Sequence, residues 1–479
     1  MPKPVEICVD DVELPTAYPQ FVGMDLAKLK CMELPEVMPP IPTSIHAKPS
    51  GEEFLATLGN PTTMLAPMVL ASETATRVLT RMYGVDVTYS PMVNVIAATT
   101  NPDLKGIVKR LDSTDRERPI IVQYAGHEAR SMLRVALRVD HRHCDAIDIN
   151  FGCPQNVARK GHYGSYLRKH WPLVYQLIAT LHVYHPLPVT AKMRLLDTPE
   201  QSVDFARLIE AAGAQMLVVH GRGPTEKQQS LSKSRWDVIR RIRESVSIPV
   251  YANGDVVDNE SHIKCMEETG CRGTMSGRSL SEYPGTYLPT EEVERRLARF
   301  DHVHFMSQHG VDYPSISASV REGRVVPSPK GETTGCLVPV PTPAEGEAEA
   351  EAERVAQWIR RVKLFLQWLS VVQELKREKG ETNTEAVAEA EGEVETPAPK
   401  GQVTARAILV HMAGSMIGRP LLKMHTDVRA SIFSRTGGVE CKGKYPSSAQ
   451  DMTRLARLGG TVLARLEQGV MYSKEAATQ

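Results

Sequence analysis

The chain has 479 residues, in which 57 lysines and arginines balance 57 aspartates and glutamates, and it contains eight cysteines. A chain of this length exceeds what one hydrophobic core usually supports, so we expect one large domain and at least one smaller unit. The balanced charge excludes any argument from net charge for binding nucleic acid or membrane. The cysteines lack paired Cys-x-x-Cys spacing, which favours a reducing compartment over a disulfide scaffold.

The first residues do not have the pattern of a targeting signal. Residues 1–13 are acidic rather than basic and lack an apolar core, and no run in the chain reaches transmembrane length. His141, His143 and Cys144 could suggest a metal site, but no second ligand pair follows at zinc-like spacing. We therefore expect a cytoplasmic protein, with the nucleus as the alternative location, that is monomeric and binds neither a membrane nor a metal.

Residues 1–51 are rich in proline and show no clear periodicity, so we expect a largely irregular N-terminal extension. From Met64 onward, short apolar runs alternate with helix-patterned polar segments, which is typical of βα units around a parallel sheet. Eight such runs begin near Met64, Val87, Pro119, Ala146, Pro188, Met216, Pro249 and Gly273. Eight βα units close a (β/α)8 TIM barrel, which we place at residues 52–289.

Two of the intervening segments show a clear helical face. Ala75, Val78, Leu79 and Met82 recur at helical spacing after the first strand, as do Phe205, Leu208 and Ile209 before the sixth. An open doubly wound sheet is the competing topology. It needs a glycine fingerprint after the first strand, and Ala66-Pro67-Met68 does not provide one.

The pattern changes towards the C-terminus. We expect a linker with an acidic stretch at residues 290–354, then a helical domain at 355–479 with an acidic insertion at about 380–400. Three helices are predicted from apolar stripes at Val355–Val372, Ile408–Met416 and Leu455–Leu466. Residues 401–479 hold eleven basic and five acidic side chains, an excess that suits an anionic partner or a solvated helix surface equally well.

The most informative segment runs from Ala146 to Gly164. An apolar strand ends in Asn150, and a Cys153-Pro154 pair then stops it, which places a thiol at the carboxyl end of a parallel strand. Reacting groups of TIM barrels lie at that end. An ordinary half-buried cysteine is the alternative, because free cysteine often packs as a small apolar residue.

Other predicted strands end in groups that suit one bound cofactor. Pro67 and Met68 offer backbone groups and an apolar wall for a flat ring, and Gln123 can donate to and accept from a heterocycle. Lys192 and Arg194 share one face of a strand, where a cation stabilises a reduced, anionic ring. The last three strands end in His220-Gly-Arg222, Asn253-Gly254-Asp255 and Ser276-Gly277-Arg278, whose glycines allow a phosphate to approach the backbone.

The chain resembles the tRNA-dihydrouridine synthases over about residues 52–289. The resemblance is carried by Leu65-Ala-Pro-Met68, Ile147-Asp-Ile-Asn-Phe-Gly-Cys-Pro-Gln155, Lys160-Gly-His-Tyr-Gly164, Val218-Val-His-Gly-Arg222 and Ile248-Pro-Val-Tyr-Ala-Asn-Gly-Asp255. The sequence around the cysteine most resembles the eukaryotic branch that acts on the adjacent D-loop uridines 16 and 17. One departure is Gly223, since the family usually has threonine directly after the arginine.

The resemblance implies an FMN-binding barrel followed by a helical tRNA-binding domain, with NADPH or NADH as reductant. Cys153 would be the proton donor. Further residues would contact FMN, namely Pro67, Met68, Gln123, Lys192, His220, Asn253, Gly254, Gly277 and Arg278. The substrate contacts would be Asn150, which could instead hold the flavin edge, and Lys160, Arg194 and Arg222.

The expected reaction is FMN-dependent reduction of the uracil C5–C6 bond in the tRNA D-loop, with the flavin passing hydride to carbon 6 and Cys153 protonating carbon 5. An ordinary thiol is largely protonated at neutral pH, as this role requires. Two alternatives remain open. One is another FMN barrel oxidoreductase, similar to dihydroorotate dehydrogenase, and the other is a tRNA-binding protein with a vestigial flavin site.

Overall fold

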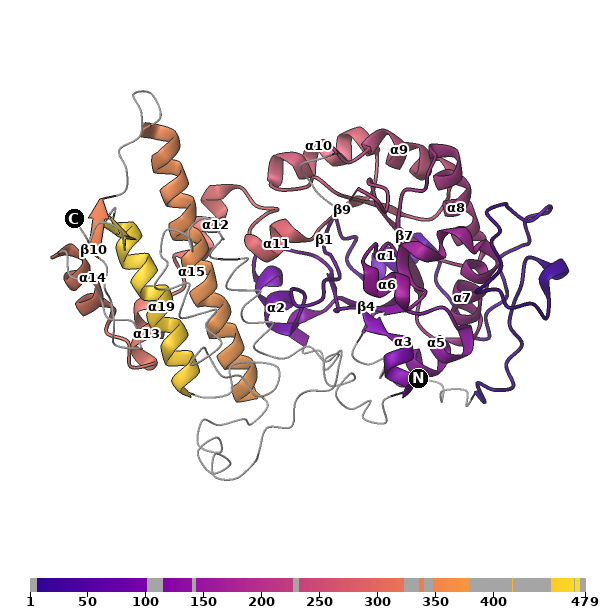
Figure 1. Ribbon diagram of the computed structural model, residues 1–479, viewed down its shortest axis with the longest axis horizontal. Helices are drawn as coiled ribbons and strands as arrows, with labels where there is room; N and C mark the ends of the chain where they lie inside the picture. The colour runs from indigo at the N-terminus through magenta and orange to yellow at the C-terminus, as the bar shows by residue number, and fades with distance from the viewer. Residues whose placement is uncertain are drawn as a thin grey trace. The chain divides into compact units, whose positions relative to one another are not determined.

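The computed structural model describes residues 7–100, 115–139, 144–226, 232–322, 336–339, 348–378, 416, 449–468 and 470–473. The chain divides into two compact units, Met1–Gly277 and Arg278–Gln479. Figure 1 shows both units and labels many of their helices and strands.

The first unit is built on a nearly closed barrel of parallel strands. Neighbours pair in the order β1-β9-β8-β7-β6-β5-β4-β2, and a bridge between Met64 and Val87 joins the first strand to the second. The main strands are β1 (Thr63–Leu65), β2 (Thr88–Tyr89), β4 (Ile120–Ala125), β5 (Ala146–Phe151), β6 (Val189–Arg194), β7 (Met216–His220), β8 (Val250–Asn253) and β9 (Gly273–Ser276). Each begins within one residue of its predicted start, and the predicted (β/α)8 barrel is confirmed. A short β3 (Val93–Asn94), which was not predicted, also pairs with β4.

Helices follow the strands and cover the outside of the barrel (Figure 1). They are α2 (Thr74–Met82), α3 (Val95–Thr100), α5 (Ala129–Ala136), α6 (Asn156–Lys160), α7 (Trp171–Tyr184), α8 (Pro199–Ala211), α9 (Trp236–Ser245) and α10 (Asn259–Thr269), with 3-10 turns η3 (Asp115–Glu117) and η5 (Gly164–Lys169). Of the predicted apolar face of α2, three residues are buried, whereas Met82 at its end is 42% exposed. The predicted face of α8 is buried throughout.

The start of α8 shows how local sequence sets a helix boundary. The Thr198 side chain accepts a hydrogen bond from the Gln201 N–H, and Pro199 occupies the first turn, where its missing N–H costs nothing. A helix end is set in the same way at α10, where Gly270 adopts a left-handed φ of +65° and donates to the Met266 carbonyl.

The N-terminal end of the barrel is covered by α1 (Gly51–Thr57), which starts with a capping box between Ser50 and Glu53. Phe54, Leu55 and Leu58 pack into the core cluster that fills the barrel. Before α1, the described part of the extension contains only the 3-10 turn η1 (Pro19–Phe21). A backbone bond from Cys31 to Lys169 holds it to η5, and one from Ile45 to Val183 holds it to α7.

The second unit contains helices and a two-stranded sheet in its described part. The helices are α11 (Arg278–Glu282), α12 (Thr290–Leu297), α13 (His302–Gln308), α14 (Tyr313–Arg321), α15 (Ala348–Glu378) and α19 (Ala449–Glu467), and β10 (Cys336–Pro339) pairs with β11 (Val470–Ser473). Residues 290–321, assigned to a linker by the sequence analysis, therefore form three helices. Their apolar residues are too few to show a long stripe, but Val293, Phe305 and Ile316 are buried.

Two of the predicted C-terminal helices correspond to α15 and α19, which pack together. Glycines permit the close approach, because a Cβ on Gly459 would lie 2.7 Å from the Leu366 Cδ2 atom. The third predicted helix, at 408–416, and the acidic insertion lie outside the described residues, apart from Met416. Of the basic residues counted beyond 401, Arg457 is exposed, whereas Arg465 is buried.

Among the described residues, no helix is long and apolar enough to cross a membrane, and no group of three or more acidic, histidine or cysteine side chains could hold a metal. Cys144 is buried and forms no disulfide, while His141 and His143 lie outside the described residues.

Candidate active site

The strand register brings the predicted residues to one end of the barrel. Asn150 lies opposite Lys192 on neighbouring strands, and Arg194 lies opposite His220, which in turn lies opposite Asn253. Because all these strands are parallel, their carboxyl ends form a single mouth. The polar side chains predicted from separate motifs therefore gather at this mouth.

Cys153 lies in the loop after β5, and hydrogen bonds hold its backbone on both sides. The Asn150 Oδ1 atom accepts from the N–H groups of Gly152 and Cys153, at 3.0 and 2.9 Å. The Cys153 carbonyl accepts from the N–H and the hydroxyl of Ser165, both at 3.0 Å. The thiol is free and partly exposed, so a substrate at the mouth could reach it.

The cysteine side chain packs against a small apolar cluster. Ala125, Ala158 and Tyr163 form its buried part, and Met92 and Tyr166 line it together with Cys153. Tyr163 belongs to the predicted Lys160–Gly164 motif, and burial raises the pKa of its hydroxyl. This motif therefore contributes a buried side chain to the cluster around Cys153.

A polar layer crosses the barrel below the cysteine loop. Gln123 donates from Nε2 to the Asp148 carboxylate at 2.8 Å and accepts from Asn150 Nδ2 at 2.8 Å. The Thr190 hydroxyl also lies 2.8 Å from this carboxylate. Asp148 was not among the predicted site residues. Strand alternation could have found it, since it shares a face of β5 with Asn150.

Two ionisable groups in this layer have shifted pKa values. Burial raises the pKa of Asp148 to about 6, although the hydrogen bonds from Gln123 and Thr190 and the charge of Lys192 oppose the shift. Burial and the nearby Arg194 lower the pKa of Lys192 to about 8. The Lys192 ammonium donates to Asn253 Oδ1 at 2.9 Å, and the Asn253 amide donates to the Met275 carbonyl at 2.8 Å.

The two predicted substrate arginines contact loop backbones at the mouth. Arg194 donates to the carbonyls of Gly152 and Gly223, at 2.9 and 3.1 Å, and so links the loops after β5 and β7. Arg222 is 3% exposed, forms an ion pair with Asp255 and donates to the Ser232 carbonyl at 2.8 Å. Both arginines therefore shape the mouth, and their contact with substrate stays a prediction.

Glycines at the ends of β8 and β9 leave little space for a side chain. Gly254 has a φ of +110°, and a Cβ there would lie 2.8 Å from the Ser234 hydroxyl. A Cβ on Gly277 would lie 3.2 Å from the Met68 sulfur. His220 accepts at Nδ1 from the Arg222 N–H, at 3.2 Å. Arg278 is exposed and starts the second unit, so its predicted cofactor contact stays a prediction.

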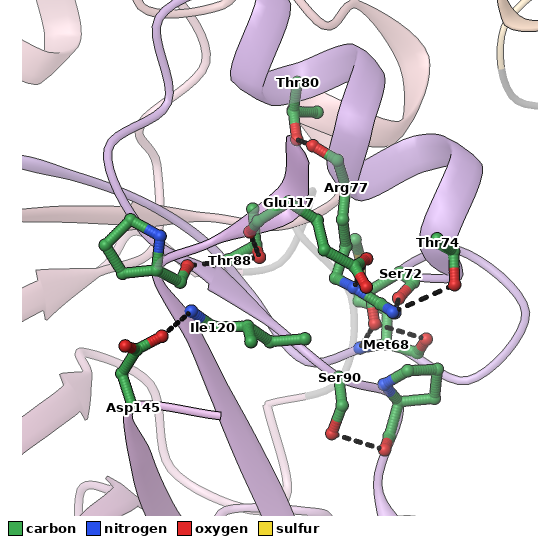
Figure 2. A network of polar contacts seen from close by, with 12 residues as sticks. Met68, Ser72, Thr74, Arg77, Thr80, Thr88, Ser90, Glu117, Ile120 and Asp145 are labelled. Carbon is green, nitrogen blue, oxygen red and sulfur yellow. Dashed lines mark hydrogen bonds and ion pairs between the residues drawn. The ribbon is translucent and has the colours of Figure 1, made fainter. Parts of the chain in front are cut away.

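A buried ion pair supports the loop that carries Pro67 and Met68 (Figure 2). Arg77 on α2 and Glu117 on η3 are both fully buried, with 2.7 Å between Nε and Oε2. Arg77 also donates to the Ser72 carbonyl, and the Ser72 hydroxyl bonds both the N–H and the carbonyl of Met68, at 2.9 and 3.0 Å. The ion pair thus fixes the backbone beside Met68.

Lys160 lies at the end of α6, directly after the cysteine loop, and is exposed together with its neighbour Arg159. The two positive side chains form a small basic patch, residues 159–160. An exposed cationic patch beside a reactive loop suits contact with a phosphate backbone.

A family model described as dihydrouridine synthase (Dus) matches residues 64–313. The tRNA-dihydrouridine(16/17) synthase [NAD(P)(+)] of Saccharomyces cerevisiae is 36% identical over 265 residues, which cover 54% of this chain and 62% of that protein. The protein of the same name in Schizosaccharomyces pombe is 35% identical over 241 residues, covering 50% of this chain and 60% of the relative.

A relative whose name states the positions 20a and 20b is also similar. The human tRNA-dihydrouridine(20a/20b) synthase [NAD(P)+]-like protein is 33% identical over 251 residues, covering 52% of this chain and 77% of that protein. The chain thus spans about three fifths of the length of the two yeast relatives that it matches.

Proposed function

Because the chain belongs to the dihydrouridine synthase (Dus) family, we propose that it is a flavin-dependent tRNA-dihydrouridine synthase that reduces the uracil C5–C6 bond of D-loop uridines. The two yeast relatives, whose names state positions 16 and 17, support the same positions here. The single observation that carries the proposal is the placement of Cys153 beside Asn150 and Lys192 at one barrel mouth.

The residues at the mouth fit FMN. Gln123, Lys192 and Asn253 offer two amides and an ammonium for the polar edge of a flavin, and the Met68 side chain offers an apolar contact for its face. The cradle at Gly254 and Gly277, which a Cβ would fill, suits a phosphate close to the backbone. We assign His220 to the same phosphate.

When bound, the flavin takes electrons from NADPH or NADH and supplies the hydride for carbon 6 of the uracil. Cys153 holds the proton that carbon 5 needs, and the bonds to its backbone N–H and carbonyl fix the direction of its side chain. Lys192 offsets negative charge on the neighbouring oxygens of the ring or the uracil. Asn150 contributes by holding the cysteine loop.

The uridine must leave its stacked position to reach a thiol inside the mouth, so the surrounding RNA has to be held elsewhere on the protein. The basic patch at residues 159–160 supplies one phosphate contact. We assign the wider tRNA contact to the helical second unit, which contains the eleven basic residues of 401–479.

The test is a flavin half-reaction under anaerobic conditions. The purified protein should bind FMN, and the bound flavin should be reduced by NADPH and reoxidised by tRNA that lacks dihydrouridine. Free orotate and fully modified tRNA are the controls, and neither should reoxidise it. A colourless protein that does not bind added FMN, or equal reoxidation by modified and unmodified tRNA, would contradict the proposal.

A further inference from the structure

A continuous chain of side-chain hydrogen bonds runs from the barrel interior to the backbone of Cys153. It starts at the Asp148 carboxylate, passes through the amides of Gln123 and Asn150, and ends at the N–H groups of Gly152 and Cys153. Every bond in it is between 2.8 and 3.0 Å long. The chain crosses from β5 to β4 and back, because Gln123 lies opposite Asp148 in the register.

The direction of every bond in this chain is fixed by its outer end. Backbone N–H groups can only donate, so Asn150 must turn its oxygen to the loop and its NH2 group to Gln123. Gln123 must then present its oxygen to Asn150 and its own NH2 group to the interior. The group that meets this last NH2 has to accept a hydrogen bond, and Asp148 is that group.

The surroundings of Asp148 fit this acceptor role. Its side chain is fully buried, and its second oxygen accepts from the Thr190 hydroxyl at 2.8 Å, so both oxygens act as acceptors. A buried amide without its acceptor would keep an unpaired donor, which is costly and opposes the orientation that the loop N–H groups require. Gln123 would then turn more easily, at the expense of its bond to Asn150.

We propose that Asp148 is a positioning residue, which stabilises from the inner end the orientation of Gln123 and Asn150 that the loop requires, and thereby holds the Cys153 loop in the geometry for proton donation. The proposal rests on the proposed function only in the role that it gives to the thiol. Asp148 is not assigned a catalytic role, because it acts through two intervening amides.

The negative charge of Asp148 offers a second explanation for an effect of this residue, and the test has to distinguish it from the hydrogen-bond chain. Lys192 and the buried Tyr89 are the other ionisable groups that interact with this carboxylate. If Asp148 acted mainly by supporting the positive charge of Lys192, a neutral acceptor in its place would fail. If it acts through the hydrogen-bond chain, a neutral acceptor of the same shape would suffice.

Two variants that keep the branch at Cγ distinguish these roles. In Asp148→Asn, the amide oxygen can accept from Gln123 while the NH2 group donates to Thr190, whose hydroxyl has an alternative acceptor in the Ile147 carbonyl at 3.2 Å. Asp148→Leu replaces both oxygens by somewhat larger methyl groups and so removes the acceptor. Asp148→Val, which suits a strand, replaces it if the leucine variant does not fold.

Three measurements are made on the full-length protein. Hydrogen exchange is followed in the peptide that contains Gly152 and Cys153, with the β7 peptide as a reference for global stability. Flavin reduction by NADPH and flavin reoxidation by unmodified tRNA are timed separately. We expect the leucine variant to exchange about tenfold faster in the loop peptide only, and to be reoxidised by tRNA about tenfold more slowly.

In the leucine variant, flavin reduction by NADPH should slow less than flavin reoxidation by tRNA, because the cysteine acts only in the second step. The asparagine variant should match the wild type within about threefold in all three measurements. Unchanged loop exchange in the leucine variant, or an asparagine variant as impaired as the leucine variant, would overturn the proposal. The exchange measurement needs neither RNA nor flavin. It therefore still decides the role of Asp148 if the wild-type protein forms no dihydrouridine and the proposed function fails.

Discussion

Gly164 lies so close to Cys153 that a side chain at position 164 would not fit. A Cβ at position 164 would lie 2.7 Å from the Cys153 carbonyl oxygen and 2.9 Å from the Cys153 Cβ. Gly164 also has a φ of +66°, which side chains rarely adopt. The glycine that ends the Lys160–Gly164 motif is therefore explained by its contact with the reactive loop.

Gly164→Ala should displace the Cys153 loop, because both the contact and the backbone angle oppose a side chain. We expect tRNA-dependent reoxidation of the reduced flavin to slow by about tenfold or more, with the flavin still reduced by NADPH. Gly59→Ala is the matched control, since Gly59 has a φ of +83° but open space around it. Equal activity of the two alanine variants would show that the contact with Cys153 has no role.

Lys192 predicts a pH dependence of flavin binding. Its pKa is lowered to about 8, so the side chain is charged below that pH and neutral above it, well before an ordinary lysine loses its proton. If the charge supports the flavin, FMN affinity measured by fluorescence titration should fall by up to about tenfold per pH unit above pH 8. Lys192→Arg, which stays charged, should abolish this fall. A wild-type affinity that is constant between pH 7 and pH 10 would argue against the role.

Lys160 predicts a salt-dependent contribution to RNA binding. Lys160→Glu should weaken tRNA binding and make the slope of log affinity against log salt shallower by about one, because one phosphate contact is lost. FMN binding should stay unchanged. Lys264→Glu, an exposed lysine on α10, serves as the control for a general change of charge. If both variants weaken tRNA binding equally, the basic patch at residues 159–160 has no specific role.

The Arg77–Glu117 pair in Figure 2 predicts a large effect on stability. Arg77→Met removes the cation beside the buried Glu117 carboxylate, which should lower the free energy of unfolding by about 3–5 kcal/mol in urea titrations. Changing both residues, as Arg77→Met with Glu117→Leu, should lower it less, since no buried charge remains. A double variant that is as unstable as the two single changes combined would show that the pair is not coupled.

Much of the barrel follows from the sequence because its signal is local. Each apolar run, such as Ala146–Phe151, predicts a strand without help from the rest of the chain. The alternation of side chains along a strand then predicts that Lys192 and Arg194 lie on the same face. The same alternation extends to Asp148. An acidic residue within an apolar strand is not itself a site signal, and its bonds to Gln123 and Thr190 need the folded barrel.

Other features depend on contacts between distant segments, and no local pattern reports them. The bond from Ser165 to the Cys153 carbonyl and the pairing of Arg77 with Glu117 need the folded positions of separate loops. The contacts of Arg194 and Arg222 with loop carbonyls are of the same kind, since a charged residue at a strand end suits substrate and backbone equally. The helices at 290–321 are short, and their apolar residues are buried by neighbours distant in the sequence. No long apolar stripe at helical spacing therefore predicts them.

The most direct test of the account is to measure dihydrouridine by mass spectrometry in an unmodified tRNA transcript after incubation with the FMN-loaded protein and NADPH. The wild-type protein should form dihydrouridine at D-loop positions 16 and 17. Cys153→Ala should still oxidise NADPH through its flavin and form dihydrouridine at least about a hundredfold more slowly. A wild-type protein that leaves the transcript unmodified, or an alanine variant that forms dihydrouridine at the wild-type rate, would contradict the account.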